Sequence, residues 1–238
     1  KTLEALSWCN EIVVVDSGST DGTQEICRKL GCKMVDQPFL GYGLQKQKGI
    51  ENATHDWVLS VDADEVVTRE LREEILKYFS SPLNVSGFYI PITMVFMGKQ
   101  FKHGAESGKL HLRLFNRSKG GFTNATVHEQ VKIDAHVGTL KNAILHYSYR
   151  SVEHYFEKFN QYTSNGAKEL FLRGKRKNIF ATSMRIPFTF IKIYFFQGCI
   201  LNGFPGFVWS VFSAYYPFVK YVKLHALHKA KQNYSFNN

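Results

Sequence analysis

The stretch that decides the fold is D-W-V-L-S-V-D-A-D-E at residues 56–65. Its first half is a short apolar run, which is typical of a strand covered on both faces. Its second half places Asp62, Asp64 and Glu65 directly after that strand. A second stretch, E-I-V-V-V-D at residues 11–16, has the same form and ends in Asp16. Because ligands bind beyond the carboxyl ends of strands in an open α/β sheet, these carboxylates are expected at the ligand-binding edge.

Strands alternate with helices over the first 80 residues. The turn S-G-S-T-D-G-T follows Asp16 and leads into the first of these helices. The alternation predicts a Rossmann-like α/β fold with a mainly parallel sheet flanked by helices. Besides the two strands quoted above, the expected elements are helices at 2–9, 22–31, 41–52 and 68–79 and a short strand at 33–36.

The regular alternation of strands and helices ends after Pro82. We predict two domains. Strand-like segments lie at 87–96, 111–115, 127–137 and 143–147, and the sequence becomes helical from Ser151. The prediction is a catalytic α/β domain over 1–150 and a basic, aromatic helical region over 151–238.

The net charge of +10 is unevenly distributed along the 238 residues. Residues 1–149 carry 17 Lys and Arg against 17 Asp and Glu, whereas residues 150–238 carry 13 against 3. An anionic partner is therefore expected for the C-terminal part alone. The four cysteines show no C-x-x-C pair and no regular spacing, which favours reduced thiols over a disulfide framework.

Three acids within four residues repel one another at the end of the strand 56–62. A divalent cation relieves this repulsion, and Mg²⁺ is usually held by one or two carboxylates together with phosphate oxygens. The alternative is an ordinary acidic helix start. The D-A-D-E segment alone leaves both interpretations open. The glycine-rich turn at 17–23 matches neither the P-loop nor the dinucleotide-binding pattern.

In combination, the motifs resemble a known family. E-I-V-V-V-D-S-G-S-T-D-G-T, then Q-K-Q-K-G-I-E-N-A, then D-W-V-L-S-V-D-A-D-E are similar in order and spacing to the family 2 inverting glycosyltransferases of GT-A fold. Within that family, V-D-A-D-E and the later V-H-E resemble the bacterial lipopolysaccharide core β-1,4-glucosyltransferases.

The resemblance implies roles for individual residues. Asp16 falls where the family's first aspartate contacts the uracil ring, and Lys46 falls where many members carry an arginine near the nucleotide. Asp62 matches the first aspartate of the D-x-D motif, beside the ribose, and is also a candidate metal residue. Asp64 matches the second, which ligates the metal, Mg²⁺ or Mn²⁺, that bridges the diphosphate. This metal offsets the charge that develops on the leaving nucleoside diphosphate.

An inverting transfer also needs a base that deprotonates the acceptor hydroxyl. The resemblance places Glu129, in T-V-H-E-Q at 126–130, at the position of this catalytic carboxylate. From the residues alone, an exposed strand pair is the favoured interpretation of His128 and Glu129. His128 is a candidate for orienting the base or contacting phosphate. Arg113 is a candidate for binding the diphosphate or an acidic acceptor, with a solvent-facing strand arginine as the equal alternative.

The family's first strand, which contributes to the uridine pocket, is not matched in this sequence, because Lys1 falls in the helix that follows that strand. From this difference we expect weak or absent UDP-sugar binding by these 238 residues alone.

The C-terminal part contains 27 residues without a formal charge, 193–219, interrupted by Gly198, Gly203, Pro205 and Gly206. The interruptions leave apolar runs of about nine and thirteen residues, both short of the roughly 20 that cross a bilayer. Two short helices with basic flanks predict a peripheral contact with an anionic membrane surface. The alternatives are a packed helical subdomain and a nucleic-acid surface, and the lack of arginines among the aromatics disfavours nucleic acid.

The sequence therefore predicts a metal-dependent inverting glycosyltransferase at the cytoplasmic face of the bacterial inner membrane. The expected donor is a UDP-sugar, UDP-glucose in particular, and the expected acceptor is a glycolipid such as the lipopolysaccharide core. Three alternatives stay open: a transferase for another glycolipid or capsule precursor, a non-catalytic membrane-binding module that retains the fold, and a phosphatase or nuclease that uses the D-A-D site.

Overall fold

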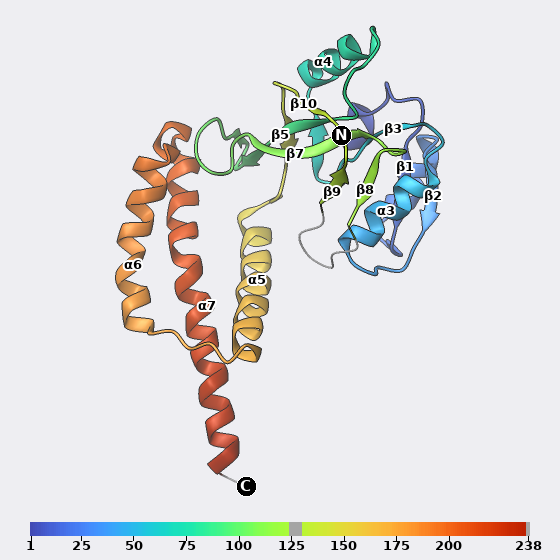
Figure 1. Cartoon of the computed structure of the whole chain (residues 1–238). Helices are drawn as coiled ribbons and strands as arrows, with labels where there is room; N and C mark the ends of the chain where they lie inside the picture. The colour runs from blue at the N-terminus through green and yellow to red at the C-terminus, as the bar shows by residue number, and fades with distance from the viewer. Residues whose placement is uncertain (124–129, 237–238) are drawn as a thin grey trace. The chain divides into compact units, whose positions relative to one another are not determined.

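A computed structural model describes residues 1–123 and 130–236 (Figure 1). The chain divides into two compact units. The first comprises Lys1–Thr93 and Gly108–His146, and the second comprises Met94–Ser107 and Tyr147–Asn238. The segment 94–107 therefore belongs with the helices, whereas the predicted boundary at residue 150 placed it in the first domain.

The first unit opens with alternating helices and strands and continues with strands joined by short turns. Its elements are α1 (Thr2–Ala5), β1 (Val13–Asp16), α2 (Thr23–Lys29), β2 (Lys33–Asp36), α3 (Tyr42–Asn52), β3 (Trp57–Leu59), β4 (Glu65–Val67), α4 (Arg69–Phe79), β5 (Gly87–Phe96, whose last three residues belong to the second unit), β7 (Lys109–Asn116), β8 (Gly120–Phe122), β9 (Val131–Ile133), β10 (Val137–Thr139) and β11 (Ile144–His146).

The strands form a mixed arrangement, so the prediction of a mainly parallel sheet is wrong. Parallel pairing joins β1 to β2 and β5 to β10. Antiparallel pairing joins β3 to β7, β5 to β7 and β4 to β11 within a seven-stranded sheet of the described residues. The physical reason lies in the connections, because a parallel pair needs a crossover of a dozen or more residues. Apart from β3 and β4, helices connect the successive strands up to β5, whereas the described strands after β5 in this unit are joined without helices. Strand β10 can still pair with β5 in parallel because several strands separate the two along the chain.

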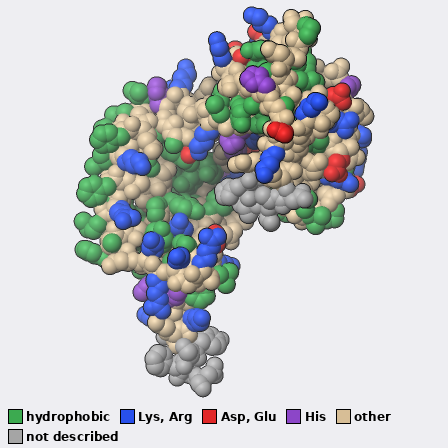
Figure 2. All heavy atoms as spheres, viewed as in Figure 1, with side chains coloured by type: hydrophobic (Ala, Val, Ile, Leu, Met, Phe, Trp, Pro, Cys, Tyr) green, Lys and Arg blue, Asp and Glu red, His purple; other side chains and the backbone are tan. Residues whose placement is uncertain are grey.

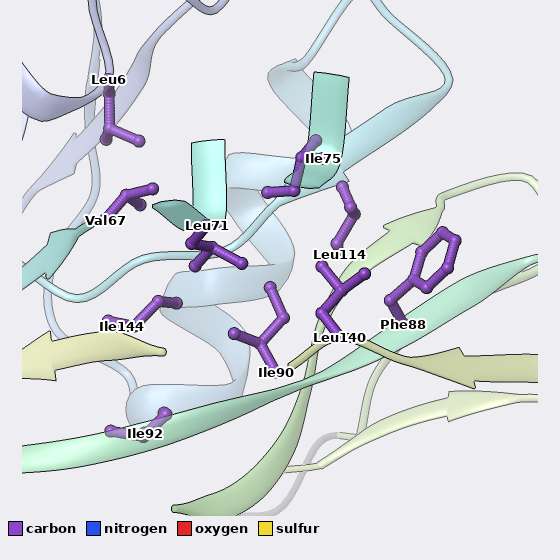
Figure 3. Close-up of a cluster of buried hydrophobic side chains, with 10 residues drawn as sticks. All are labelled: Leu6, Val67, Leu71, Ile75, Phe88, Ile90, Ile92, Leu114, Leu140 and Ile144. Carbon is purple, nitrogen blue, oxygen red and sulfur yellow. The ribbon is translucent and has the colours of Figure 1, made fainter. Parts of the chain in front are cut away.

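Apolar side chains between the seven-stranded sheet and α4 form the core of the first unit. Leu71 of α4, Ile90 of β5 and Ile144 of β11 are fully buried and lie together (Figure 3). Helix α4 begins at Thr68, whose hydroxyl accepts a hydrogen bond from the Leu71 N–H at 3.2 Å. This N-cap fixes the start of the helix and thereby the side chains that it directs at the sheet.

In the second unit, α7 (Phe204–Phe236) packs against α5 (Val152–Leu172) and α6 (Ile179–Ile191) (Figure 1). A π-helical turn, η1 (Lys192–Phe196), and a 3₁₀ turn, η2 (Cys199–Asn202), connect α6 to α7, and β6 (Lys99–Gln100) pairs with the end of β5. The predicted interruption is present, because Gly198 and Gly203 both adopt positive φ. However, α7 extends over 33 residues through Pro217, far beyond the predicted thirteen.

Aromatic rings and one buried amide join the segment 94–107 to the helices of this unit. Phe96 contacts Tyr155 and Trp209 with ring centroids 6.0 and 5.5 Å apart. The Asn202 side chain accepts from the Lys102 N–H at 3.0 Å and donates to the His103 carbonyl at 2.8 Å. This amide replaces water for backbone groups that would otherwise be buried without partners.

Replacing Ile90 by Ala should lower the free energy of unfolding by about 2–5 kcal/mol, because it leaves a cavity in a fully buried site. Urea unfolding followed by circular dichroism measures this change. Leu110→Ala on β7 is the control, since Leu110 is 53% exposed and should cost far less. Equal losses for the two variants would contradict the assigned core.

Candidate functional site

Asp16 is the last residue of β1, and its carboxylate is buried inside the turn that follows. Its Oδ1 accepts hydrogen bonds from the N–H groups of Gly18 (3.0 Å) and Ser19 (2.9 Å) and from Nε2 of Gln24 (2.6 Å). The Ser19 hydroxyl donates to Oδ2 at 2.5 Å. These bonds, first of all those from Ser19, outweigh burial and lower the pKa of Asp16 to about 2. The carboxylate is therefore ionised and held in one orientation.

Helix α3 connects the end of β1 to the D-A-D-E segment through two consecutive residues. Nε2 of Gln45 donates to the Ser17 hydroxyl at 2.8 Å. The next residue, Lys46, places its Nζ 2.9 Å from Oδ1 of Asp62. The helix can approach β1 closely because Gly49 lies against Val15, where an added Cβ would come within 3.3 Å of Cγ2. Helix α3 thus contacts both strand ends, at Ser17 next to Asp16 and at Asp62 itself.

Gln45 also carries an unsatisfied acceptor. Among the described residues, its Oε1 is buried and has no hydrogen-bond partner. Buried side-chain oxygens are normally hydrogen-bonded, so an exception next to Ser17 needs an explanation. An N–H or O–H donor from a ligand would supply the missing bond.

The D-A-D-E segment is a tight turn that closes on itself. The Glu65 N–H donates to the Asp62 carbonyl at 2.9 Å, and the Asp62 N–H donates to Glu65 Oε2 at 2.8 Å. The antiparallel register of β3 and β7 places Arg113 beside this turn, where the Ser60 N–H donates to the Arg113 carbonyl at 2.8 Å. The buried guanidinium then lies 2.7 Å from Glu65 Oε1 and 3.1 Å from Asp62 Oδ2.

The pKa values of the two carboxylates are shifted in opposite directions. Burial alone would raise the pKa of Asp62, but Arg113 and Lys46 outweigh it and hold the pKa at about 2. Burial is the largest influence on Glu65 and raises its pKa, even though Arg113 opposes the shift. One guanidinium therefore balances two acids, and a second cation, Lys46, completes the balance at Asp62.

Asp64 points to a different partner. Its Oδ2 lies 3.3 Å from Nε2 of His146, at the end of β11, and its side chain is 41% exposed. The hydrogen bond to Asp64 raises the pKa of His146. No group of three or more His, Cys, Asp or Glu side chains in the described ranges is arranged to hold a metal ion alone. Asp64 and His146 form a pair of partly exposed side chains beside the turn.

The hairpin of β8 and β9 is attached to the same helix. Oε1 of Gln47 accepts from the Phe122 N–H at 3.0 Å, and the Lys46 ammonium lies 5.7 Å from the centre of the Phe122 ring. The hairpin therefore lies beside the residue of α3 that contacts Asp62.

Residues 124–129 follow β8, and the two predicted acceptor-side residues, His128 and Glu129, lie outside the described residues. Their described neighbours are joined, because the Thr123 N–H donates to the Gln130 carbonyl at 2.9 Å. The roles predicted for His128 and Glu129 stay predictions.

Of the predicted residues, Lys46 and Arg113 both contact Asp62, and α3 also contacts Ser17, the residue after Asp16. Arg113 is not the solvent-facing arginine of the alternative interpretation, because only 8% of the residue is exposed. His146 and Gln45 were not among the predicted site residues. His146 could have been found from its position near the end of the predicted strand 143–147, since Asp16 and Asp62 were predicted from their positions at strand ends.

Asp16→Ala should lower the free energy of unfolding by about 2 kcal/mol near neutral pH, because several hydrogen bonds to a charged acceptor are lost. The folded-state pKa is depressed, so this stabilisation is complete above the ordinary value of 3.8 and disappears as the pH falls towards 2. Denaturant unfolding between pH 5 and pH 2 tests this: the two proteins should converge on acidification. Asp36→Asn on β2, an exposed site, serves as the control, and a constant difference across this range would contradict the assignment.

Arg113→Met should cost about 3 kcal/mol or more of unfolding free energy, because it leaves Glu65 buried without its cation. The double variant Arg113→Met/Glu65→Leu removes the stranded charge and should recover part of the loss. Urea unfolding of the two variants measures the coupling. A double variant whose loss equals the sum of the single losses would show that the pair is not coupled.

Comparisons with known proteins agree with these motifs. The chain matches Glycosyl transferase family 2 over residues 9–135. It is 32% identical over 235 residues to an uncharacterized glycosyltransferase of Rickettsia typhi, covering 94% of this chain and 80% of that protein. It is also 28% identical over 238 residues to the lipopolysaccharide core biosynthesis glycosyltransferase LpsC of Rhizobium meliloti, covering 97% and 88% of the two chains.

A similarity to a solved structure is weaker. The crystal structure of S. aureus TarS 1–349 aligns over 98% of this chain and 86% of that one, with a TM-score of 0.45 and 14% identity. Values this low assign neither a ligand nor a role. The match over residues 9–135 and the similarity along the length of the Rickettsia protein do assign the family: the chain belongs to glycosyltransferase family 2 and is a glycosyltransferase.

Proposed function

We propose that this glycosyltransferase transfers a hexose from a UDP-sugar, with inversion, to a lipid-linked saccharide of the lipopolysaccharide core type. UDP-glucose is the proposed donor. The acceptor class is supported by the similarity to LpsC, whose name places that protein in lipopolysaccharide core biosynthesis.

The observation that carries the proposal is the bridge that α3 makes between the ends of β1 and β3. Consecutive residues of one helix contact Ser17, next to Asp16, and Asp62. A nucleoside diphosphate has two chemically different parts, a polar base with ribose and a multiply charged diphosphate. The free acceptor of Gln45 and the fixed carboxylate of Asp16 suit the donors of the nucleoside. Lys46 suits the diphosphate.

Asp64 and His146 are the residues that would hold a divalent cation. The Asp64 carboxylate fits Mg²⁺ or Mn²⁺, because such ions prefer oxygen ligands, take one or two of them from the protein and complete their coordination with phosphate oxygens and water. The His146 imidazole is the less usual ligand of the two for these ions. A bound cation would stabilise the negative charge on the leaving diphosphate. Asp62 fits this role less well, because Lys46 and Arg113 already occupy its oxygens.

Glu129 is the proposed base. As the acceptor hydroxyl attacks the anomeric carbon, its proton passes to the Glu129 carboxylate, the bond to the diphosphate oxygen breaks, and UDP leaves from the opposite face. Inversion follows from this geometry, because attack and departure occur on opposite sides of one carbon.

A donor screen tests the proposed function. UDP release would be measured with several UDP-sugars, with and without intact glycolipid acceptor and with its delipidated saccharide. We expect acceptor-dependent release with one hexose donor. Glu129→Gln should lower the rate by at least about a hundredfold with little change in donor affinity, because proton transfer contributes about 10²–10⁴ to such rates. Asp64→Ala should abolish the metal-dependent part of the rate.

Glu25→Gln is the matched control, since Glu25 is an exposed carboxylate on α2 to which no role in the site is assigned. Phosphate ester hydrolysis without any acceptor would instead support the phosphatase or nuclease alternative. An active Asp64→Ala protein would contradict the assignment of the cation ligand, and an active Glu129→Gln protein would contradict the assignment of the base.

A further inference from the structure

Helix α6 carries a row of apolar side chains that nothing in the described structure of its unit covers. Phe180, Met184, Phe188, Ile191 and Phe195 are 75, 53, 70, 42 and 54% exposed. Their spacing of four, four, three and four residues keeps them on one side of the helix and its π-helical turn, since a helix repeats every 3.6 residues. Figure 2 shows hydrophobic side chains gathered along the edge where Figure 1 places α6. We call these five residues the apolar stripe.

The stripe is not a core face that packing has left incomplete. The opposite side of α6 is already packed, with Thr182 buried and Phe190 contacting Phe207 of α7 at 5.7 Å between ring centroids. Contiguous exposed apolar surface of this kind marks a binding surface for a protein or a membrane. The neighbouring charges decide between the two.

Exposed cations lie beside the stripe on the same helix. Arg185 and Lys192 each follow a stripe residue by one position, which turns them by about 100° around the helix, and both are exposed. The residues 175–177, Lys-Arg-Lys, precede α6 and are exposed as well. After Glu169 the sequence contains no Asp or Glu. An apolar stripe flanked only by cations is typical of helices that lie in the interface of anionic bilayers.

By length and composition, α6 together with its π-helical turn is also long and apolar enough to cross a membrane. Ile179–Phe196 is the one such segment in the described residues, with a mean hydropathy of 1.2 and 6% of its residues buried. A crossing orientation would place Arg185 in the hydrocarbon, where a charged side chain is strongly disfavoured. An orientation parallel to the surface puts the stripe in the acyl region and both cations at the phosphates.

We propose that the apolar stripe of α6 and η1 is the surface by which this protein binds an anionic phospholipid bilayer, with the helix lying parallel to the membrane plane. The proposal does not rest on the transferase reaction. It requires only the exposed side chains and the charges beside them.

Binding of the purified full chain to vesicles tests the proposal, with sedimentation of pure phosphatidylcholine vesicles and of equimolar phosphatidylcholine and phosphatidylglycerol vesicles. We expect stronger binding to the anionic vesicles and loss of that preference in high salt. Phe188→Ser should lower the partition constant roughly tenfold, because it removes a large apolar group from the acyl region. The double variant Arg185→Gln/Lys192→Gln should lower the ratio of binding to anionic over neutral vesicles roughly tenfold.

Phe39→Ser is the matched control, since Phe39 is an equally apolar side chain of the first unit and is 55% exposed. It should bind vesicles like the unchanged protein. Circular dichroism checks that each variant keeps its helices. The vesicle assay contains neither acceptor nor nucleotide-sugar. Vesicle binding can therefore be lost while the proposed transferase function holds, and the transferase function can be contradicted while vesicle binding holds. Equal binding by Phe188→Ser and the unchanged protein would overturn the proposal.

The orientation has its own test. Tryptophan placed at residue 180, 188 or 195 (Phe180→Trp, Phe188→Trp, Phe195→Trp) would be quenched by lipids brominated near the headgroup or near the chain end. A parallel helix predicts the same shallow depth at all three positions. Deep quenching at 188 with shallow quenching at 180 and 195 would show a crossing helix. A dimer that Phe188→Ser dissociates, with vesicle binding unchanged, would show that the stripe binds a second copy.

Discussion

The rest of the site depends on one buried guanidinium. Arg113 balances the charges of Glu65 and Asp62 at once, and both acids belong to a turn that closes on its own backbone. Without that cation the turn would hold two carboxylates in a partly buried position, at a cost of several kcal/mol. With it, Asp62 is ionised and oriented towards Lys46. The position of α3, and through it the link to the end of β1, follows from this pairing.

Much of this arrangement could be predicted from the sequence, because the signals are local. The runs at 11–16 and 56–65 indicated strands that end in carboxylates, and the family follows from their order and spacing. Other features depend on contacts between distant residues. Arg113 pairs with Glu65 only through the register of β7 on β3, and His146 reaches Asp64 only because β11 pairs with β4. The mixed sheet escaped prediction because buried strands of either direction share the same apolar pattern.

In the helical unit, too, local features could be predicted from the sequence and features that depend on packing could not. Gly198 and Gly203 marked the interruption correctly, since both need positive φ. The length of α7 was underestimated because the helix was expected to end with the charge-free run at residue 219, whereas packing against α5 and α6 accompanies a helix that continues to Phe236. The apolar stripe could not be separated from a core face by periodicity alone. Only the exposure of each side chain distinguishes the two.

A titration of the Asp62 carboxyl carbon by NMR tests the central claim most directly. If Arg113 and Lys46 hold Asp62 as described, its pKa is about 2 in the unchanged protein and rises in Arg113→Met. The stabilisation that it contributes is then present above the ordinary value of 3.8 and lost as the pH falls towards 2. An unshifted pKa of 3.8 that Arg113→Met leaves unchanged would contradict the account, since the turn, α3 and the donor site would then not depend on this charge.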